Sequence, residues 1–258
     1  MNEKLGTARL RRFKQAILFV SWVIAAGWTP RTQAQGVNFA APSLRSDAKV
    51  SVRELQVPAK ARDEFEQGLR RLTKRDAIGS LRHFDAAIRV SPEYYEAYYY
   101  EGVAEMQLRN NEEALRRFQK AVELSGGSYA NAEFGYGLAL LREGREEEAE
   151  REVRHGLESD PNNVDGHVVL GFVLLKLNRP DEAEQNGKEA LDTNGPNSVK
   201  GYLVLSDVDA AKRNYGGQMR DLDAYLKLCP HDPNKTTLQA VRDLAKRLAA
   251  KGQLTASK

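Results

Sequence analysis

The feature of this 258-residue chain that most constrains its fold is a sequence pattern that recurs every 34 or 35 residues. The copies begin near Ala61, Tyr95, Ala130, Val164 and Val199. A period of this length is typical of solenoid proteins, in which a single repeat cannot bury its own apolar face and is stable only when stacked on its neighbours. We therefore expect the body of the chain to fold as an array of stacked units.

Four places within each copy carry the same kind of residue. Small residues occupy most of the eighth, twentieth and twenty-seventh places, and proline or glycine occupies the thirty-second. In that order the residues are Gly68, Gly102, Gly137, Gly171 and Ser206; Ser80, Ala114, Ala149, Ala183 and Gln218; Ala87, Ala121, Gly156, Ala190 and Tyr225; and Pro92, Gly126, Pro161, Gly195 and Pro230. A small residue lets two antiparallel helices approach closely, and proline or glycine ends the second helix.

This pattern closely resembles the tetratricopeptide repeat, a helix–turn–helix unit, over about residues 59–233. The resemblance implies an all-α fold, a right-handed α-solenoid of about five units. The fifth copy departs from the pattern at Ser206, Gln218 and Tyr225, so we expect its helices to pack less closely or at altered angles. Apolar residues at helical spacing predict one more helix over 234–252, which would cap the open apolar face of the last unit.

Residues 1–34 have the layout of a secretory signal peptide. A basic cluster from Arg9 to Lys14 precedes an apolar run, and Thr32-Gln33-Ala34 places small residues before an expected cleavage site after Ala34. The alternative interpretation is an uncleaved N-terminal anchor. Both predict an exported body, periplasmic or extracellular, and a bacterial export route fits this leader. Residues 35–58 show no sustained helical or strand period and are interpreted as a linker.

Charge and cysteine content exclude several classes of function. The leader carries about +5 of net charge, which leaves about −2 for the rest of a chain whose formal total is +3. The body therefore has no electrostatic reason to bind nucleic acid. The single cysteine lies in Cys229-Pro230-His231-Asp232, whose side chains could bind a metal or act as a nucleophile. Pro230 fills the helix-ending place and no second cluster exists, so a loop is favoured, and we expect no metal and no cofactor.

Catalytic motifs are missing from the sequence. It contains no nucleophile elbow, no phosphate-binding glycine loop and no zinc-protease spacing, so we expect no enzymatic activity. Glu101 and Glu105 lie four residues apart on one helix face and could share a proton or hold a cation. The favoured alternative is pairing with a nearby arginine or lysine, because an isolated buried charge is costly. Arg71 is the candidate partner.

The resemblance also predicts where a partner would bind. In this family the first helix of each unit lines a concave groove through its second, fifth, ninth, twelfth and thirteenth places. The residues predicted to bind a partner are Phe65, Leu69, Tyr99, Val103, Met106, Phe134, Leu138, Arg142, Val168, Phe172, Lys176 and Leu203. Such an apolar stripe favours an extended or helical peptide as its ligand. Two alternatives remain, namely that these side chains pack internally or that the linker covers them.

The function that the sequence favours is a non-catalytic, exported, monomeric scaffold that binds a protein or peptide partner and helps to assemble an envelope complex. The carboxylate clamp by which related arrays hold acidic peptides of heat-shock chaperones is absent, because Phe65 and Leu69 stand where the first copy would carry its Lys and Asn. The alternative function is binding of a cell-wall polymer or another glycan, with Tyr95, Tyr99 and Phe134 as stacking platforms.

Overall fold

The computed structural model describes residues 57–193, 195 and 197–256. These residues form eleven α-helices and one short 3₁₀ helix, and they contain no β-strand. They divide into two compact units, one ending at Pro161 and the other beginning at Asn162. The predicted leader and nearly all of the predicted linker lie outside the described residues, so these two assignments stay predictions.

The first unit holds three helix pairs. They are α3 (Ala59–Thr73) with α4 (Ala77–Val90), α5 (Tyr95–Leu108) with α6 (Asn111–Ser125), and α7 (Ala130–Arg142) with α8 (Glu146–Ser159). Each helix packs against the next one along the chain, and α5 also contacts α3 and α7. The first helices of the three pairs are therefore neighbours within this unit.

The second unit holds two pairs and a final helix. They are α9 (Val164–Lys176) with α10 (Pro180–Asp192), then the 3₁₀ turn η2 (Ser198–Lys200), α11 (Gly201–Ala211) with α12 (Tyr215–Leu228), and α13 (Lys235–Ala256). Each helix again packs against its successor, and α13 lies on α12 with Leu238 and Ala245 buried. The expected all-α array of helix–turn–helix units is thereby confirmed for the described residues.

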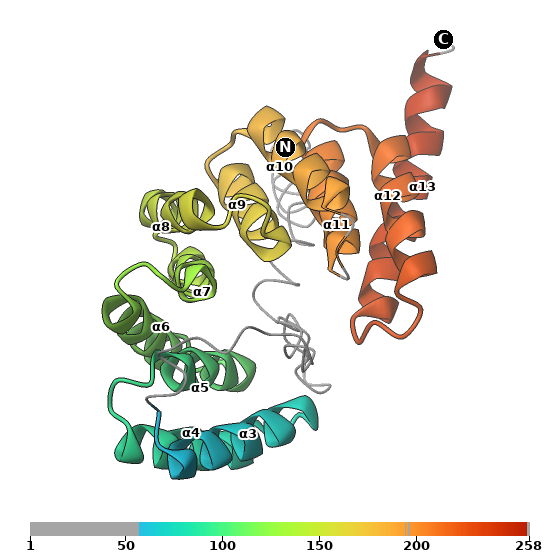
Figure 1. The fold of residues 1–258 in the computed structure, drawn as a ribbon. Helices are drawn as coiled ribbons and strands as arrows, with labels where there is room; N and C mark the ends of the chain where they lie inside the picture. The colour runs from blue at the N-terminus through green and yellow to red at the C-terminus, as the bar shows by residue number, and fades with distance from the viewer. Residues whose placement is uncertain (1–56, 194, 196, 257–258) are drawn as a thin grey trace, which may run out of the picture. The chain divides into compact units, whose positions relative to one another are not determined.

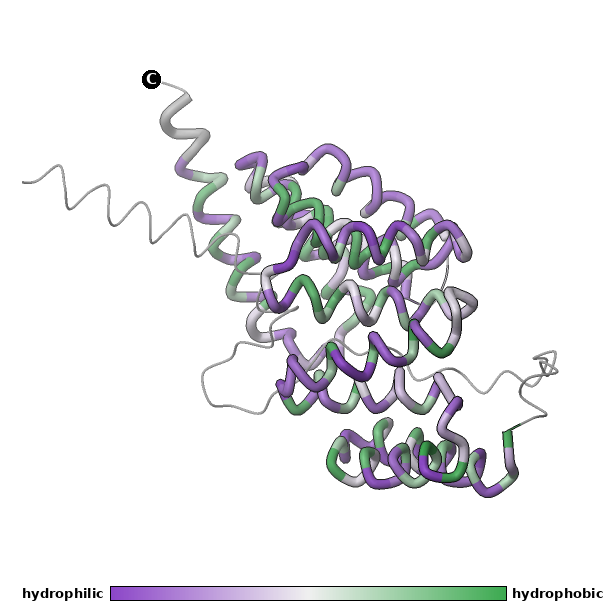
Figure 2. Tube along the Cα trace, turned by 90° about the vertical axis from the view of Figure 1, so that its left-hand side faces the viewer, coloured by the Kyte–Doolittle hydropathy of each residue, from purple (hydrophilic) through white to green (hydrophobic). Residues whose placement is uncertain are grey.

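Hydrophilic and hydrophobic residues alternate along most helices at intervals of about a turn, as Figure 2 shows. Such a pattern buries one stripe of a helix and leaves the other in water. The small residues allow the buried stripes to meet closely. A β-carbon on Gly102 would stand 2.9 Å from the Phe118 ring, one on Gly68 would stand 2.5 Å from Phe84, and one on Gly137 would overlap Val153. Each glycine of the eighth place in this unit therefore makes room for a side chain of the paired helix.

The turn inside every helix pair contains one residue with left-handed backbone geometry, at the fifteenth place of the copy. The φ angles are 61° at Arg75, 64° at Arg109, 74° at Gly144, 58° at Asn178 and 59° at Arg213. Glycine and asparagine adopt this conformation readily, whereas an arginine there is strained. Three of the five turns therefore retain a residue that is poorly suited to their backbone.

The fifth copy accommodates its larger residues by burying them. Ser206, Gln218 and Tyr225 are all buried. The Tyr225 hydroxyl donates a hydrogen bond of 2.7 Å to Asp232 Oδ2, and Asp232 Oδ1 accepts one of 2.6 Å from the backbone N–H of Asn234. The large side chain at the twenty-seventh place is thus tied to the loop that leads into α13.

Candidate partner-binding surface

The structure buries most of the side chains that the sequence assigns to partner binding in the first unit. Buried members are Tyr99, Val103 and Met106 of α5 and Phe134 and Leu138 of α7. Three members remain half-buried, namely Phe65 and Leu69 of α3 and Arg142 at the end of α7. The helices α3, α5 and α7 are the first helices of their pairs, and the surface that they form is here termed the first-helix face. Buried apolar residues therefore lie beneath this face, and few of its apolar side chains are accessible.

Tyr99 shows why these rings are covered. Its ring centroid lies 4.9 Å from that of Tyr100, 5.4 Å from that of Tyr129 and 5.6 Å from that of Phe118 in α6. The contacts with Tyr100 and Tyr129 are edge-to-face, an arrangement that aromatic rings prefer. Tyr99 therefore packs within its own repeat and against the turn before α7, which favours internal packing for this residue.

Phe134 is 1% exposed and packs against the second helix of its own pair. A β-carbon placed on Gly156 of α8 would stand 2.6 Å from Phe134 Cε1. The small residue at the twenty-seventh place of this copy thus makes room for an aromatic ring at the fifth place. For Phe134, too, the contacts favour internal packing, while a role in partner binding stays a prediction.

Phe65 differs because its side chain remains partly accessible. The ring centroid lies 4.9 Å from that of Tyr94 and 5.5 Å from that of Tyr100, and the side chain packs against a buried cluster that includes Ala61 and Ala97. Leu69, one turn further along α3, is half-buried as well. These two residues are the accessible apolar members of the predicted set in the first unit.

In the second unit the predicted residues follow the same division. Val168 and Phe172 of α9 and Leu203 of α11 are buried, whereas Lys176 at the end of α9 is exposed. Lys200 Nζ lies 2.7 Å from Asp165 Oδ1, so these flanking charges form an ion pair.

Arg142 has an unusual environment. Its Nη1 lies 3.4 Å from Met106 Sδ, and its Nε is buried without a hydrogen-bond partner. Burial, and then the charge of Arg109, lower the pKa of this guanidinium to about 10. The sequence assigns Arg142 to the edge of the predicted groove. It does not single out Arg109, because the left-handed backbone conformation of Arg109 is seen only in the structure.

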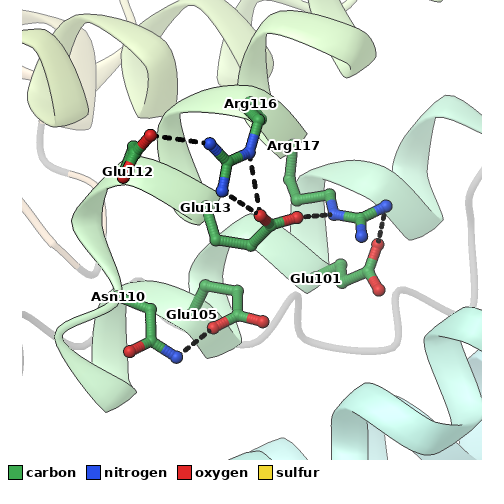
Figure 3. Close-up of polar contacts among 7 residues, drawn as sticks. All are labelled: Glu101, Glu105, Asn110, Glu112, Glu113, Arg116 and Arg117. Carbon is green, nitrogen blue, oxygen red and sulfur yellow. Dashed lines mark hydrogen bonds and ion pairs between the residues drawn. The ribbon is translucent and has the colours of Figure 1, made fainter.

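The carboxylates Glu101 and Glu105 do not form a shared site. Glu101 Oε2 lies 3.2 Å from Arg117 Nη1, while Glu105 Oε2 accepts a hydrogen bond of 2.7 Å from Asn110 Nδ2 (Figure 3). Arg117 also donates to Glu113 from its Nε at 2.7 Å. Pairing with an arginine is therefore confirmed for Glu101, but the expected partner is wrong, since Arg71 binds Asp76 at 3.1 Å instead.

Burial dominates the charge state of Glu101. Its side chain is 6% exposed, and desolvation raises its pKa to about 7 against the opposing effect of Arg117. Because the folded protein binds this proton more tightly than the unfolded chain, stability falls as the pH rises from about 4.5 to about 7. The charged group thus weakens the fold at neutral and higher pH.

We expect Glu101→Gln to remove this dependence. At pH 8 the variant should be more stable than the original chain by up to roughly 3 kcal/mol, and at pH 4 the two should differ little. Urea denaturation across this pH range measures the difference. Glu105→Gln, one turn further along the same helix, is the control. Because burial is the largest cause of the raised pKa of Glu101 and the charge of Glu105 is a smaller one, this variant should keep most of the pH dependence. If Glu105→Gln removes the pH dependence as fully as Glu101→Gln does, burial of Glu101 is not its main cause.

Histidines join first and second helices within repeats. His83 Nδ1 lies 2.8 Å from Glu64, His155 Nδ1 lies 2.8 Å from Glu133, and His167 Nδ1 lies 3.1 Å from Glu189. The sequence alone shows no shared repeat place for the three histidines, and it does not predict the pairs. Each histidine and its glutamate lie on different helices of one pair, so they come together only once the helices have packed. Within the described part of the chain, no cluster of three potential metal ligands exists.

The loop that contains Cys229 has a structural arrangement. Cys229 follows the last residue of α12 and is half-buried, and burial raises the pKa of its thiol. A raised thiol pKa disfavours the thiolate, which is the nucleophilic form. Asp232 accepts hydrogen bonds from Tyr225 and from a backbone N–H. These observations support the loop interpretation of this segment.

Comparison with known proteins places the chain in a family. The family model described as "Tetratricopeptide repeat" matches residues 65–129, 101–164 and 137–199, and thus covers more than half of the chain. The chain belongs to the tetratricopeptide repeat family.

None of the described helices combines sufficient length with an apolar stretch that could cross a membrane.

Individual relatives are distant. The chain is similar to a DnaJ homolog subfamily C member 3 of Gallus gallus, with 29% identity over 110 residues, 43% of this chain and 22% of that protein. The chain thus spans less than a quarter of that relative's length. Among solved structures it resembles TTC0263, a thermophilic TPR protein of Thermus thermophilus, with a TM-score of 0.62, 17% identity, and coverage of 72% of this chain and 98% of that one.

A second similar structure is YrrB, described as a TPR protein with an unusual peptide-binding site. Its TM-score is 0.50 at 17% identity, and the match covers 76% of this chain and 95% of that one. At these identities the likeness to either solved structure shows the fold alone.

Proposed function

We propose that this protein is an exported, non-catalytic tetratricopeptide scaffold that binds a protein or peptide partner and helps to assemble an envelope complex. Family membership supports a role in protein interaction, and peptide binding is described for the similar YrrB structure. The fold hosts many roles, so the location of the binding surface is argued from the side chains of this chain.

The observation that carries the proposal is the accessible apolar surface on the first helix α3. The second helices α4, α6, α8 and α10 each contain an ion pair between residues four apart, such as Arg116 with Glu112. Such pairs suit a surface that faces water. Helix α3 has one such pair too, but it also presents the half-buried apolar side chains Phe65 and Leu69. A protein interface typically has an apolar centre that is surrounded by a polar rim, and α3 offers both.

The proposed binding surface therefore begins at Phe65 and Leu69 and continues over the first-helix face of the first unit, with Arg142 at its edge. The buried members of the predicted set, such as Tyr99 and Phe134, would shape this face from beneath. In the second unit, Lys176 is the accessible member of the set.

We expect Leu69→Asp to weaken capture of the partner at least tenfold, because a charge at the centre of an apolar contact must be desolvated. The full chain, tagged at its C-terminus, would be used to capture envelope proteins, and the bound partner would be quantified by mass spectrometry. Ile78→Asp is the matched control, since Ile78 is an exposed apolar residue on the second helix α4. Equal capture by both variants, with unchanged thermal unfolding, would exclude the first-helix face as the binding surface.

Export is proposed from the leader pattern in residues 1–34. Fractionation of a bacterial host that expresses the full chain, with intact-mass measurement of the product, tests it. Loss of residues 1–34 in a periplasmic or secreted product would support cleavage, a full-length product in the membrane fraction would support an anchor, and a full-length product in the cytoplasm would exclude export.

No observation favours the glycan-binding alternative. Tyr99 and Phe134 are buried, and Tyr95 is half-buried with its ring centroid 5.3 Å from that of Tyr129. Stacking on a sugar ring requires an accessible ring face. This alternative would be restored if the protein sedimented with insoluble peptidoglycan and the Tyr95→Ala variant did not.

A further inference from the structure

Three repeats contain a histidine–glutamate pair that has one member at the fourth place of its copy. The second and fifth copies have an aromatic residue at this place, Tyr98 and Tyr202. Three copies therefore have a titratable pair where two others have an aromatic ring. The pairs, with the fourth-place residue first, are Glu64 with His83 at 2.8 Å, Glu133 with His155 at 2.8 Å, and His167 with Glu189 at 3.1 Å.

The pair of the third copy differs from the other two because its carboxylate is completely buried. The Glu133 side chain is 0% exposed, whereas that of Glu64 is 27% exposed and that of Glu189 is 42% exposed. Glu133 Oε1 lies 2.8 Å from His155 Nδ1, and Oε2 is buried without a hydrogen-bond partner among the described residues. A buried carboxylate needs a compensating charge, and His155 can supply it when it is protonated.

Two glycines enclose this pair. A β-carbon on Gly127, in the turn before α7, would stand 3.3 Å from His155 Cε1 and 3.6 Å from Glu133 Oε1. A β-carbon on Gly156 of α8 would stand 2.8 Å from Glu133 Oε2. The pair therefore lies where three segments meet, namely α7, α8 and the turn between α6 and α7.

The same turn also contacts the aromatic residues of α5. The ring centroid of Tyr129 lies 5.3 Å from that of Tyr95 and 5.4 Å from that of Tyr99. Tyr99 is one of the buried residues of the predicted partner-binding set. A change in the position of this turn would therefore alter the packing beneath the first-helix face.

Both members of the pair bind protons more tightly in the folded protein. The hydrogen bond and the charge of Glu133 raise the pKa of His155 above its usual 6.5. Burial raises the pKa of Glu133 against the opposing effect of His155. Stability therefore falls as the pH rises. The contribution of His155 is complete below pH 6.5 and is lost as the pH rises through its raised pKa.

The neighbouring charges favour the protonated pair as well. Glu152 and Glu158, which lie three residues before and after His155 on α8, raise the pKa of both members further, as smaller causes. On α5, the charge of Glu96 acts on Tyr129 of the turn. Charged groups of the packed helices that have partners elsewhere are Arg154 with Glu150 on α8 and Glu123 with Lys120 on α6.

We propose that the His155–Glu133 pair is a pH-sensitive clasp that holds α8 and the turn before α7 against α7 while it is protonated, and that partner binding weakens when a rising pH opens it. Only the second part rests on the proposed function. Loss of the proton leaves the buried carboxylate of Glu133 without a compensating charge, which weakens the contact among the three segments. An aromatic ring such as Tyr98 would hold its two helices without this dependence on pH.

The titration of His155 tests the clasp directly. The full chain with isotope-labelled histidine would be titrated by nuclear magnetic resonance, and His155→Gln identifies the signal by its loss. We expect a pKa above 6.5 for His155, and a return toward 6.5 in Glu133→Gln. His83→Gln, which removes the histidine of another pair, is the control and should leave the titration of His155 unchanged. An identical titration in the original chain and in Glu133→Gln would overturn the proposal.

Hydrogen exchange measures whether the clasp holds the turn. Glu101→Gln would serve as the background, so that the titration of Glu101 does not contribute. After correction for intrinsic rates, protection of amides 126–133 should fall about threefold or more from pH 6 to pH 8.5, the size expected for a partly exposed ion pair. His155→Gln on this background should be weakly protected at both pH values. Because His155 is 62% exposed, this variant should still fold. The same pH dependence with and without His155 would overturn the clasp.

Capture of the partner tests the second part of the proposal. Capture by the original chain should fall about threefold from pH 6 to pH 8.5, and capture by His155→Gln should not change with pH. Capture that is independent of pH in the original chain, or that depends on pH equally in both, would exclude the link to binding. If Leu69→Asp leaves capture intact, the proposed binding surface is wrong, whereas the titration and exchange measurements still test the clasp because they use no partner.

Discussion

Replacing Phe134 with alanine is expected to lower the free energy of unfolding by about 3–5 kcal/mol. The ring is 1% exposed and lies against Gly156 of α8, so its removal leaves a cavity between α7 and α8 that the helices cannot close without moving. Urea denaturation followed by circular dichroism measures the change. Ile78→Ala, at a side chain that is 61% exposed, is the control and should change stability by well under about 1 kcal/mol.

This experiment also decides between the two interpretations of the apolar stripe. A large loss of stability in Phe134→Ala, together with a similar loss in Tyr99→Ala, would establish that the fifth-place rings are core residues. A stable, cooperatively unfolding Phe134→Ala protein that no longer captures its partner would instead show that the ring is accessible to a ligand, and would contradict the burial of Phe134.

The second large effect is expected from Gly137→Leu. A β-carbon at this position already overlaps Val153 and stands 3.3 Å from the backbone oxygen of Ala149, so a leucine must force α7 and α8 apart. Overpacking of this kind costs roughly 1–3 kcal/mol or more. The fall in the urea midpoint would be compared with that of Gly216→Ala, because a β-carbon on Gly216 would make only ordinary van der Waals contacts, at 3.9 Å from Arg220 and Asn214, and its φ is not positive.

Ala149→Leu should act in the same direction as Gly137→Leu, since Ala149 is completely buried in the facing helix. If either variant unfolds at the same urea concentration as the original chain, the assignment of these residues to the close helix contact is wrong. A selective loss of far-ultraviolet helicity in proportion to one repeat would show that the damage stays local, as expected for an array in which each unit contacts only its neighbours.

Much of the fold is predictable from sequence because the relevant physics is local and repeated. Glycine occupies the eighth place mainly because the two helices of a pair are in close contact there. The copies repeat this constraint at a fixed interval. Phe84 and Phe118 illustrate the point, since each fills the space that a glycine of the paired helix leaves. The helix–turn–helix units, their order and the all-α class follow from that periodicity.

The candidate site is less predictable, because exposure depends on what the neighbouring elements cover. Phe65 and Phe134 share the fifth place of their copies, yet Phe65 is half-buried and Phe134 is completely covered. Sequence reasoning treats them alike, since periodicity reports which face of a helix a residue is on and carries no information about the depth of its cover. The partner of Glu101 is likewise a matter of packing, because Arg117 lies on the paired helix of the same repeat.

Periodicity alone is enough to identify this chain as a tetratricopeptide array with small residues at its helix contacts, because those constraints recur at a fixed spacing and need no knowledge of distant contacts. Packing in three dimensions is needed to learn which apolar side chains of the first helices stay accessible, which carboxylate binds which arginine, and that Arg142 Nε is buried without a hydrogen-bond partner in the described chain. Burial and charge pairing are set by side chains from different helices, and these side chains meet only once the helices have packed.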